Sequence, residues 1–138
     1  MSDVAGRRSN DGGGIVQTVA LARVLIIEDD EDTRAGLEIR LRAAGYKVWG
    51  AASGAQGLAL AGEHDPNVVV LDLGLPDTGG LSVLARMSVV APNARVIVFS
   101  AWDAQRYEVE AMVAGAALYL EKPIGGDQVV AAVEGLLG

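Results

Sequence analysis

The sequence predicts an α/β protein in which five parallel strands form one doubly wound sheet covered by five helices. Three observations support this prediction. Short apolar runs recur along the chain, as strands buried on both faces require. Segments with apolar residues at helical spacing separate these runs, and the alternation extends over about 115 residues. Right-handed crossovers between parallel strands then place helices on both faces of the sheet.

A local pattern in the sequence predicts each strand and each helix. Strands are predicted where apolar residues run together, and helices where they repeat every three or four positions. Gly45 and Gly115 stand where helices commonly stop, and Ser53 and Asp127 are candidate N-caps. In chain order we expect a strand at 24–27, a helix marked by Thr33, Leu37, Leu41 and Ala44, a strand at 46–51, a helix from Ser53 to about Glu63, a strand at 68–71, a helix marked by Leu81, Leu84 and Ala85, a strand at 95–99, a helix at 104–114, a weaker strand at 117–120, and a last helix with the stripe Val129, Val130, Val133, Leu136 and Leu137.

Composition and charge narrow the class of protein. The chain has 138 residues, 51% hydrophobic and 21% charged, which suits one globular domain. Its 18 acidic and 11 basic residues give a net charge of −7, which opposes binding to nucleic acid through phosphate contacts. The sequence contains no cysteine, so disulfides and thiolate metal sites are excluded. Because it shows neither an apolar run of ~20 residues nor a secretory signal, we expect a cytoplasmic protein without membrane insertion.

The first 21 residues differ from the rest. Gly, Ser, Asn and Asp dominate residues 1–14, which end in three glycines. Such a segment buries little apolar area, so we expect a disordered N-terminal extension at 1–21 and a folded domain at 22–138. Native sequence, a cloning remnant and upstream sequence from an early start codon are all compatible with this extension. A stand-alone protein and a fragment of a longer regulator are likewise both compatible with the sequence.

Acidic residues directly follow two of the predicted strands. The first strand ends in a run of five acids at 28–32, and the third ends in Asp72. The later acids of the run suit a helix N-terminus, but Glu28 follows apolar residues at the strand end. In doubly wound sheets ligands bind outside the carboxyl ends of the strands, where neighbouring first and third strands would bring Glu28, Asp29 and Asp72 together. Two carboxylates ~4 Å apart repel by about 4 kcal/mol at an effective dielectric of ~20, so we expect a hard divalent cation such as Mg²⁺ there.

Two other strand ends carry residues suited to a phosphoryl group. The fourth strand ends at Ser100, followed by Ala101, although a serine there is commonly a cap or turn residue. The fifth ends with Glu121, Lys122 and Pro123. Lys122, which would otherwise face solvent, projects toward the acids from the same edge as a compact positive charge. Pro123 locks the next loop, through either the common trans or the rarer cis Lys122–Pro123 bond.

Four segments together resemble the bacterial response-regulator receiver domain of two-component signalling, of the chemotaxis-regulator type. They are VLIIEDDEDTR (24–34), VVVLDLGLPDTGGL (68–81), VIVFSA (96–101) and GAALYLEKP (115–123), and the resemblance covers residues 23–138. It implies a flavodoxin-like sheet of strand order 2-1-3-4-5 and a signalling switch, not an enzyme, that assists its own phosphorylation and dephosphorylation. A sensor histidine kinase or a histidine phosphotransfer protein is implied as the phosphoryl donor, and an unidentified protein as the downstream target.

The resemblance also implies roles for residues at the strand ends, with Mg²⁺ or Mn²⁺ as the cofactor. The implied roles are phosphoacceptor for Asp72, direct metal ligand for Asp29, water-mediated ligand for Glu28, backbone-carbonyl ligand for Gly74, phosphoryl hydrogen bonding for Ser100 and for the backbone amide of Ala101, phosphoryl pairing for Lys122, and aromatic switch for Tyr119. Asp30 is not expected to be a ligand. Gly74 and Trp102 stand where residues tune dephosphorylation in this family, so the sequence leaves the phosphoryl lifetime open.

Three other functions fit the sequence less well. A nucleotide-binding domain places its glycines after the first strand, whereas the glycine-rich stretch at 50–57 follows the second. A Mg²⁺-dependent phosphatase with an aspartyl-phosphate intermediate needs an acid two residues after the nucleophile, where Gly74 stands. A receiver-like module that is never phosphorylated predicts the loss of at least one acid of the cluster or of Lys122, and all of these are present.

Overall fold

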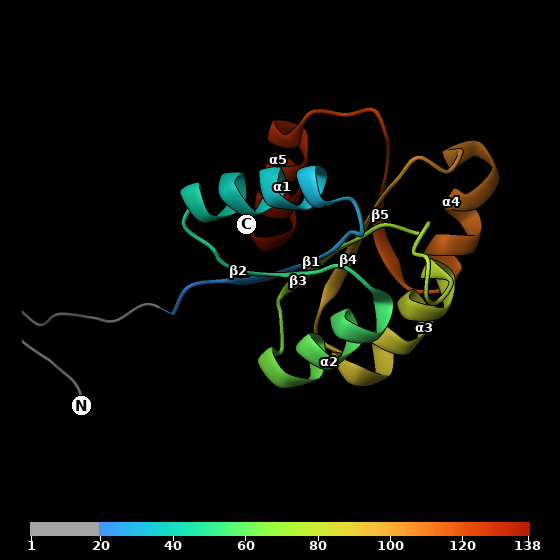
Figure 1. Cartoon of the computed structure of the whole chain (residues 1–138), viewed down its shortest axis with the longest axis horizontal. Helices are drawn as coiled ribbons and strands as arrows, with labels where there is room; N and C mark the ends of the chain where they lie inside the picture. The colour runs from blue at the N-terminus through green and yellow to red at the C-terminus, as the bar shows by residue number, and fades with distance from the viewer. Residues whose placement is uncertain (1–19) are drawn as a thin grey trace, which may run out of the picture.

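The computed structural model describes residues 20–138, so most of the extension predicted at 1–21 lies outside the described residues. Within residues 20–138, five parallel strands form one sheet in the order β2-β1-β3-β4-β5, and five helices alternate with them (Figure 1). The predicted doubly wound, flavodoxin-like fold is confirmed. No helix in this part of the chain has the length and apolar character needed to cross a membrane. The elements are β1 (Arg23–Ile27), α1 (Glu31–Ala43), β2 (Lys47–Ala51), α2 (Gly54–His64), β3 (Val68–Leu71), α3 (Gly80–Val90), β4 (Arg95–Ser100), α4 (Ala104–Val113), β5 (Ala116–Glu121) and α5 (Gly126–Leu137).

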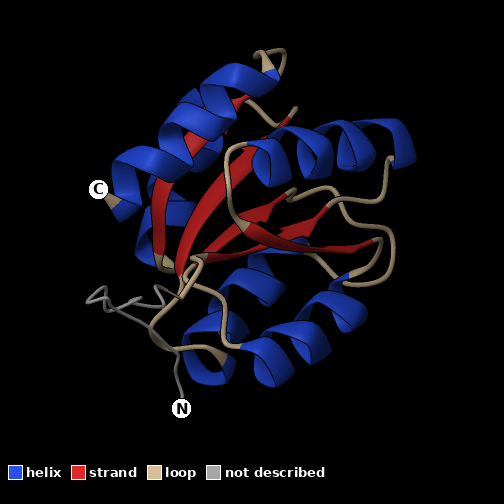
Figure 2. Cartoon of the chain, turned by 90° about the vertical axis from the view of Figure 1, so that its left-hand side faces the viewer, coloured by secondary structure: helices blue, strands red, loops and turns tan. Residues whose placement is uncertain are grey.

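Helices cover both faces of the sheet (Figure 2). α1 and α5 pack on one face, and α2, α3 and α4 on the other. Because successive strand residues point to opposite faces, Val24 and Ile26 join the core under α1 and α5, whereas Leu25 and Ile27 join the core under α2 and α3. All four residues of β3 are buried, as expected for a central strand covered on both faces.

The register of the strands places their carboxyl ends at one edge of the sheet. Ile27 of β1 pairs with Leu71 of β3, which also pairs with Val98 of β4. Ser100, the last residue of β4, pairs with Glu121, the last residue of β5. The residues that follow these strands therefore lie near one another, at the edge where ligands of such sheets bind.

Several helix ends follow the local signals in the sequence. Ser53 is the N-cap of α2, where its side chain accepts a hydrogen bond from Gln56 N–H. Gly45 and Gly115 follow α1 and α4 with φ values of 100° and 117°. Residues with a side chain rarely adopt this left-handed conformation, which explains why glycine ends both helices. These three predictions are confirmed.

Two predictions at the end of the chain are wrong in detail. Asp127 does not cap the last helix, because Gly125 is the N-cap and Asp127 lies in the first turn of α5. There its carboxylate pairs with Arg40 of α1 at 2.6 Å. An acid stabilises a helix start from either position, so the sequence signal does not separate them. β5 extends over Ala116–Glu121 instead of 117–120, since an edge strand that is only half-buried carries a weak apolar pattern.

Candidate functional site

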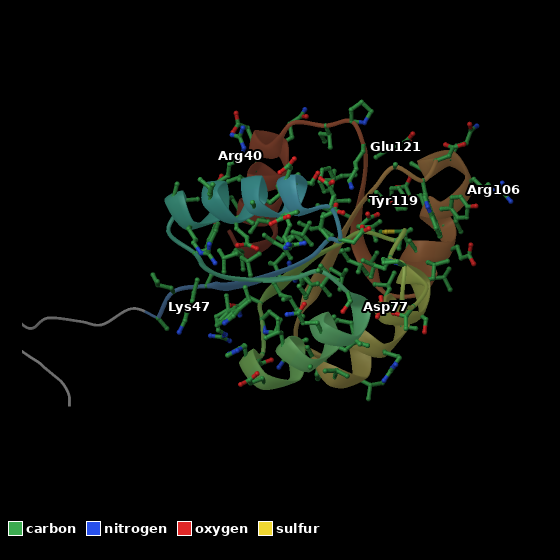
Figure 3. The ribbon with its side chains drawn as sticks, viewed as in Figure 1. Arg40, Lys47, Asp77, Arg106, Tyr119 and Glu121 are labelled. Carbon is green, nitrogen blue, oxygen red and sulfur yellow. The ribbon has the colours of Figure 1, made fainter. Side chains whose placement is uncertain are left out.

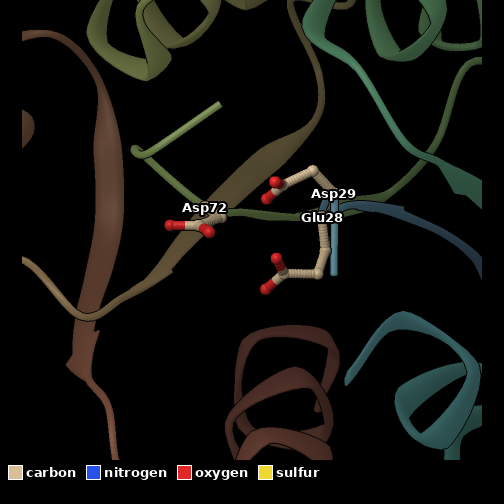
Figure 4. A group of neighbouring side chains, drawn as sticks. All are labelled: Glu28, Asp29 and Asp72. Atoms are coloured by element: carbon tan, nitrogen blue, oxygen red, sulfur yellow. The ribbon is translucent and has the colours of Figure 1, made fainter. Parts of the chain in front are cut away.

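Three carboxylates meet at the ends of β1 and β3 (Figure 4). Oxygen atoms of Glu28, Asp29 and Asp72 all lie within 4.8 Å of one another. Strand pairing holds two of these residues, because Glu28 N–H donates to Ala51 O and Asp72 N–H donates to Ile27 O, both at 3.0 Å. The structure therefore brings together the three acids that the sequence placed at neighbouring strand ends.

Lys122 reaches this acidic cluster from the end of β5. Its Nζ lies 2.6 Å from Glu28 Oε1 and 3.5 Å from Asp72 Oδ2. The ammonium group also lies 5.0 Å from the ring centroid of Phe99. Lys122 N–H donates to Ser100 O at 2.8 Å, and the Lys122–Pro123 peptide bond is cis. The bond to Ser100 O thus holds the backbone of Lys122 while its side chain spans two acids.

Burial and charge oppose each other within the cluster. Burial raises the pKa of the Glu28 carboxyl, as does the charge of Asp72, against hydrogen bonds from Lys122 and from Asp30 N–H. Burial alone would lower the pKa of Lys122, but its hydrogen bond to Glu28 and the charge of Asp72 outweigh this effect and raise it. Lys122 is therefore held in its charged form. With one ammonium for three carboxylates, the cluster still has an excess of acidic groups.

Ser100 and Tyr119 lie on the neighbouring strands β4 and β5 and share a contact with Trp102. Ser100 is fully buried, and its Oγ accepts a hydrogen bond from Trp102 N–H at 3.3 Å. The hydroxyl of Tyr119, a residue labelled in Figure 3, donates to Trp102 O at 2.8 Å. Burial and the nearby charge of Glu121 raise the pKa of Tyr119, which keeps its hydroxyl a donor. Ala101 lies between these contacts in the exposed loop after β4.

Gly74, two residues after Asp72, borders the site opposite Trp102. Its N–H donates to Asp72 Oδ1 at 3.1 Å. A methyl group added at Gly74 would lie 3.5 Å from Trp102 Nε1 and 3.8 Å from Asp72 Oδ1. The indole therefore lies beside the opening to Asp72. Trp102 is 36% exposed, and its ring packs 4.9 Å from the ring of Tyr107.

The donor set of the cluster suits a hard divalent cation. Such cations prefer carboxylate and carbonyl oxygens, and three carboxylate oxygens converge here. Both oxygens of Glu28 already accept hydrogen bonds, Oε1 from Lys122 and Oε2 from Asp30 N–H at 3.1 Å. Asp29 is exposed and Asp72 half-buried, so these two acids have more room for a direct contact with an ion. Asp30 instead accepts hydrogen bonds from Thr33 as the N-cap of α1.

Two residues that support the site were not predicted from the sequence. Arg34 of α1 donates from Nη1 to Glu28 O at 2.8 Å and so holds the end of β1. Its place one turn into the helix after the acids is a signal that could have identified it. Asp77 accepts hydrogen bonds from the backbone of α2, from residues 22 and 23 positions earlier in the chain. No local pattern identifies partners at that separation.

Clustered acids and a lysine at the carboxyl edge of a doubly wound sheet suit a domain that accepts a phosphoryl group on an aspartate. Residues 24–134 match the family model of the response regulator receiver domain. Because the match extends over most of the sequence, the chain belongs to the response regulator receiver domain family.

Individual relatives agree with this assignment. The chain is 44% identical over 110 residues to the transcriptional regulatory protein KdpE of Mycobacterium tuberculosis, which covers 78% of this chain and 47% of KdpE. It is similar to the structure of a CheY-like response regulator receiver domain protein from Methanospirillum hungatei JF-1, with a TM-score of 0.80, 28% identity, and coverage of 85% of this chain and 94% of that chain. A response regulator from Burkholderia pseudomallei, solved with a phosphorylated aspartic acid, gives a TM-score of 0.74 at 28% identity, covering 83% of this chain and 71% of that chain. The chain spans about half the length of the curated relatives it matches.

Membership of this family defines the kind of function. Receiver domains are signalling switches of two-component systems, and histidine kinases phosphorylate them on an aspartate. The pocket formed by Glu28, Asp29 and Asp72 fits the phosphoacceptor site of such a domain. The predicted family and signalling function are therefore confirmed.

Proposed function

We propose that Asp72 accepts a phosphoryl group from a sensor histidine kinase or a histidine phosphotransfer protein, in a reaction that requires Mg²⁺ or Mn²⁺. The observation that carries this proposal is the position of Lys122 between two acids of the cluster. The side chain of Asp72 is 12% exposed, compared with 3% for Glu28, so Asp72 is the more accessible acid beside the ammonium. An accessible carboxylate next to a fixed positive charge suits a nucleophile that must receive a dianionic group.

In the proposed transfer, a carboxylate oxygen of Asp72 attacks the phosphorus atom of the donor's phosphohistidine. A P–O bond forms to Asp72 as the P–N bond breaks, and the donor imidazole leaves with the bonding electron pair and takes up a proton from water. Lys122 pairs with one phosphoryl oxygen. The Ser100 hydroxyl, whose oxygen already accepts from Trp102 N–H, can donate its proton to another, as can Ala101 N–H.

Four residues would hold the divalent cation in this proposal. Asp29 and Asp72 contact it directly with carboxylate oxygens, Gly74 contributes its backbone carbonyl, and Glu28 acts through water because both its oxygens are engaged. When bound, the cation neutralises negative charge on the phosphoryl oxygens.

The output is proposed to be a change in a protein-binding surface. Phosphorylation draws the Ser100 hydroxyl toward Asp72, which weakens its contact with Trp102 N–H, and Tyr119 moves because its hydroxyl is bonded to the same residue. The surface formed by α4, β5 and α5 then changes its shape for an unidentified downstream protein. We place this switch in the cytoplasm and expect no binding to duplex DNA by this domain, because its net charge of −7 repels phosphates.

Phosphorylation by acetyl phosphate tests the central assignment. Wild-type protein should gain the mass of one phosphoryl group when Mg²⁺ is present and should remain unmodified when the cation is removed with EDTA. Asp72→Asn should remain unmodified under both conditions, since an amide replaces the attacking carboxylate. Intact-protein mass spectrometry measures each result directly.

A matched control separates loss of the nucleophile from loss of an acid in general. Asp65→Asn changes an acid whose side chain is 65% exposed in the turn before β3, at the other end of the sheet. This variant should be phosphorylated like the wild type. Equal modification of the wild type and Asp72→Asn would remove Asp72 from the proposed role.

A further inference from the structure

The loop that carries Asp72 and Gly74 is attached to the start of α2. We define the phosphoacceptor loop as residues 72–79, between β3 and α3. Within it lies Asp77, which is labelled in Figure 3. Asp77 Oδ1 accepts from Gly54 N–H at 2.9 Å, and Asp77 Oδ2 accepts from Ala55 N–H at 3.0 Å. Both carboxylate oxygens are therefore used on backbone donors of the first turn of α2. These bonds hold the pKa of the Asp77 carboxyl below its usual value, so the carboxylate stays charged.

α2 also has a cap from its own sequence, beside Asp77. Ser53 already caps the helix through the bond from Gln56 N–H to Ser53 Oγ at 3.2 Å. The Gln56 side chain in turn accepts from Ala52 N–H at 3.1 Å, which resembles the reciprocal arrangement of a capping box. Local residues thus satisfy Gln56 N–H, whereas Gly54 N–H and Ala55 N–H bond to Asp77. The two bonds to Asp77 add a connection between α2 and the phosphoacceptor loop.

The chain between Asp77 and the site has little freedom to absorb movement. Only Leu75 and Pro76 separate Asp77 from Gly74; the leucine is buried in the core and the proline ring fixes its own φ. On the other side, Gly80 N–H donates to Leu73 O at 3.0 Å. A Cβ at Gly80 would collide with the backbone of Leu73, so α3 begins in direct contact with the loop. A shift at Asp77 must therefore reach the Gly74 carbonyl.

A second close contact joins the same two segments. A Cβ at Gly54 would collide with Thr78 Oγ1 and with the side chain of Val83. The absence of a side chain at Gly54 lets the loop approach the helix closely enough for both hydrogen bonds to Asp77. Hydrogen bonding and packing thus fix the same separation between α2 and the loop.

From these contacts we infer that Asp77 is a positioning residue for the phosphoacceptor site: by clamping the phosphoacceptor loop to α2, it holds the Gly74 carbonyl and Asp72 where they bind the divalent cation. The inference rests on the proposed function, since it takes Asp72 and Gly74 as ligands. In this inference α2 holds the phosphoacceptor loop in place and contributes no ligand to the cation. Loss of the two hydrogen bonds to Asp77 should therefore lower the affinity for the cation clearly, while the thermal stability of the domain falls only slightly.

The test compares two cap deletions on the same helix. Asp77→Ala removes the clamp from the loop, and Ser53→Ala removes the cap that belongs to α2. Each variant loses hydrogen bonds at the first turn, so both should have a Tm a few degrees below the wild type. Only Asp77→Ala should bind Mn²⁺ more weakly, by about tenfold, the lower end of the loss expected when a group that orients metal ligands is removed. Ser53→Ala should stay within about twofold of the wild-type Kd, measured by titration calorimetry.

Further measurements make the result independent of phosphorylation activity. Beryllofluoride with Mg²⁺ should slow amide exchange at Gly54 and Ala55 in the wild type, because a fixed loop opens less often. If Asp77→Ala fails to fold, Asp77→Asn serves instead; it keeps the volume and one acceptor oxygen and should show a smaller loss in the same direction.

The outcomes separate the two proposals. Mn²⁺ affinities that fall equally in Asp77→Ala and Ser53→Ala, or in neither, would show that Asp77 is only a second cap, and so would unchanged exchange at Gly54 and Ala55. A wild-type protein that binds no Mn²⁺ and accepts no phosphoryl group would instead overturn the proposed function, and this inference with it.

Discussion

α2 and α4 lie on the same face of the sheet, but they are attached to it very differently. Four residues of α2 are buried, and two sets of hydrogen bonds cap its start. α4 buries only Ala111 among its residues, and its start is held by Asp103 and by a bond from Ala104 N–H to Glu121 Oε1 at 3.0 Å. Three large apolar side chains of α4 are exposed: Val109, Met112 and Val113.

This difference indicates where a change at Asp72 can be transmitted. A segment with few buried side chains opens or shifts at a lower free energy than one with more of them buried. α4 also starts two residues after Trp102, the residue that contacts both Ser100 and Tyr119. On the proposed function, we therefore expect α2 to be the fixed side of the site and α4 to be the side that responds to phosphorylation.

The largest expected effect contrasts the packing of the two helices. Leu58→Ala in α2 removes a buried side chain and should lower the free energy of unfolding by about 2–5 kcal/mol. Val109→Ala in α4 removes a side chain that is 75% exposed and should change it by less than ~0.5 kcal/mol. Urea unfolding of both variants measures the two values. Similar losses would mean that α4 is packed more tightly than its exposure indicates.

The next effect concerns transmission through Ser100. Ser100→Ala should still accept a phosphoryl group at Asp72, but the response of α4 should be weak because the new hydrogen bond to the phosphoryl oxygen is lost. A hydrogen bond to a charged group contributes ~1.5–3 kcal/mol, about a ten- to hundredfold change in the population of the switched state. Amide chemical shifts of residues 104–122, recorded with and without beryllofluoride, measure this response. The full wild-type shift pattern in Ser100→Ala would contradict the proposed coupling.

The smallest effect concerns the start of α4. Glu121→Ala removes the acceptor for Ala104 N–H, and amide exchange there should become roughly two- to fivefold faster, as expected for one exposed hydrogen bond. Exchange at Gly54 and Ala55 in α2 should not change. Glu110→Ala, which alters an exposed acid within α4, provides the control and should leave both regions as in the wild type. Faster exchange in α2 as well would show that the two helices are not independently attached.

The sequence predicted the fold well because the signals for this fold are local. Apolar runs and helical periodicity identify strands and helices, and alternation of the two leads to a parallel sheet. The acids of the site were predictable for a related reason. Glu28 and Asp72 each follow a strand directly, so a rule about strand ends places them together without knowledge of distant contacts.

The features that could not be predicted depend on contacts between distant parts of the chain. Asp77, within Pro-Asp-Thr-Gly-Gly, has the local pattern of a turn before α3, but its carboxylate binds α2. Asp127 has the local pattern of a cap, but the packing of α1 against α5 pairs it with Arg40. In both cases the acid lies at a helix start, and tertiary structure determined which helix or partner its side chain meets.

The position of Trp102 has a consequence for optical measurements. The chain has two tryptophans, and only Trp102 borders the opening to Asp72. Trp49 lies on β2, at the opposite edge of the sheet from β5, stacked on His64 with ring centroids 4.3 Å apart. The fluorescence of an indole depends on its surroundings. A phosphoryl group on Asp72 should therefore change the emission of Trp102 and leave the emission of Trp49 constant. The receiver domain thus contains a signal and an internal reference for its own occupancy, and Trp49→Phe would turn it into a single-fluorophore sensor.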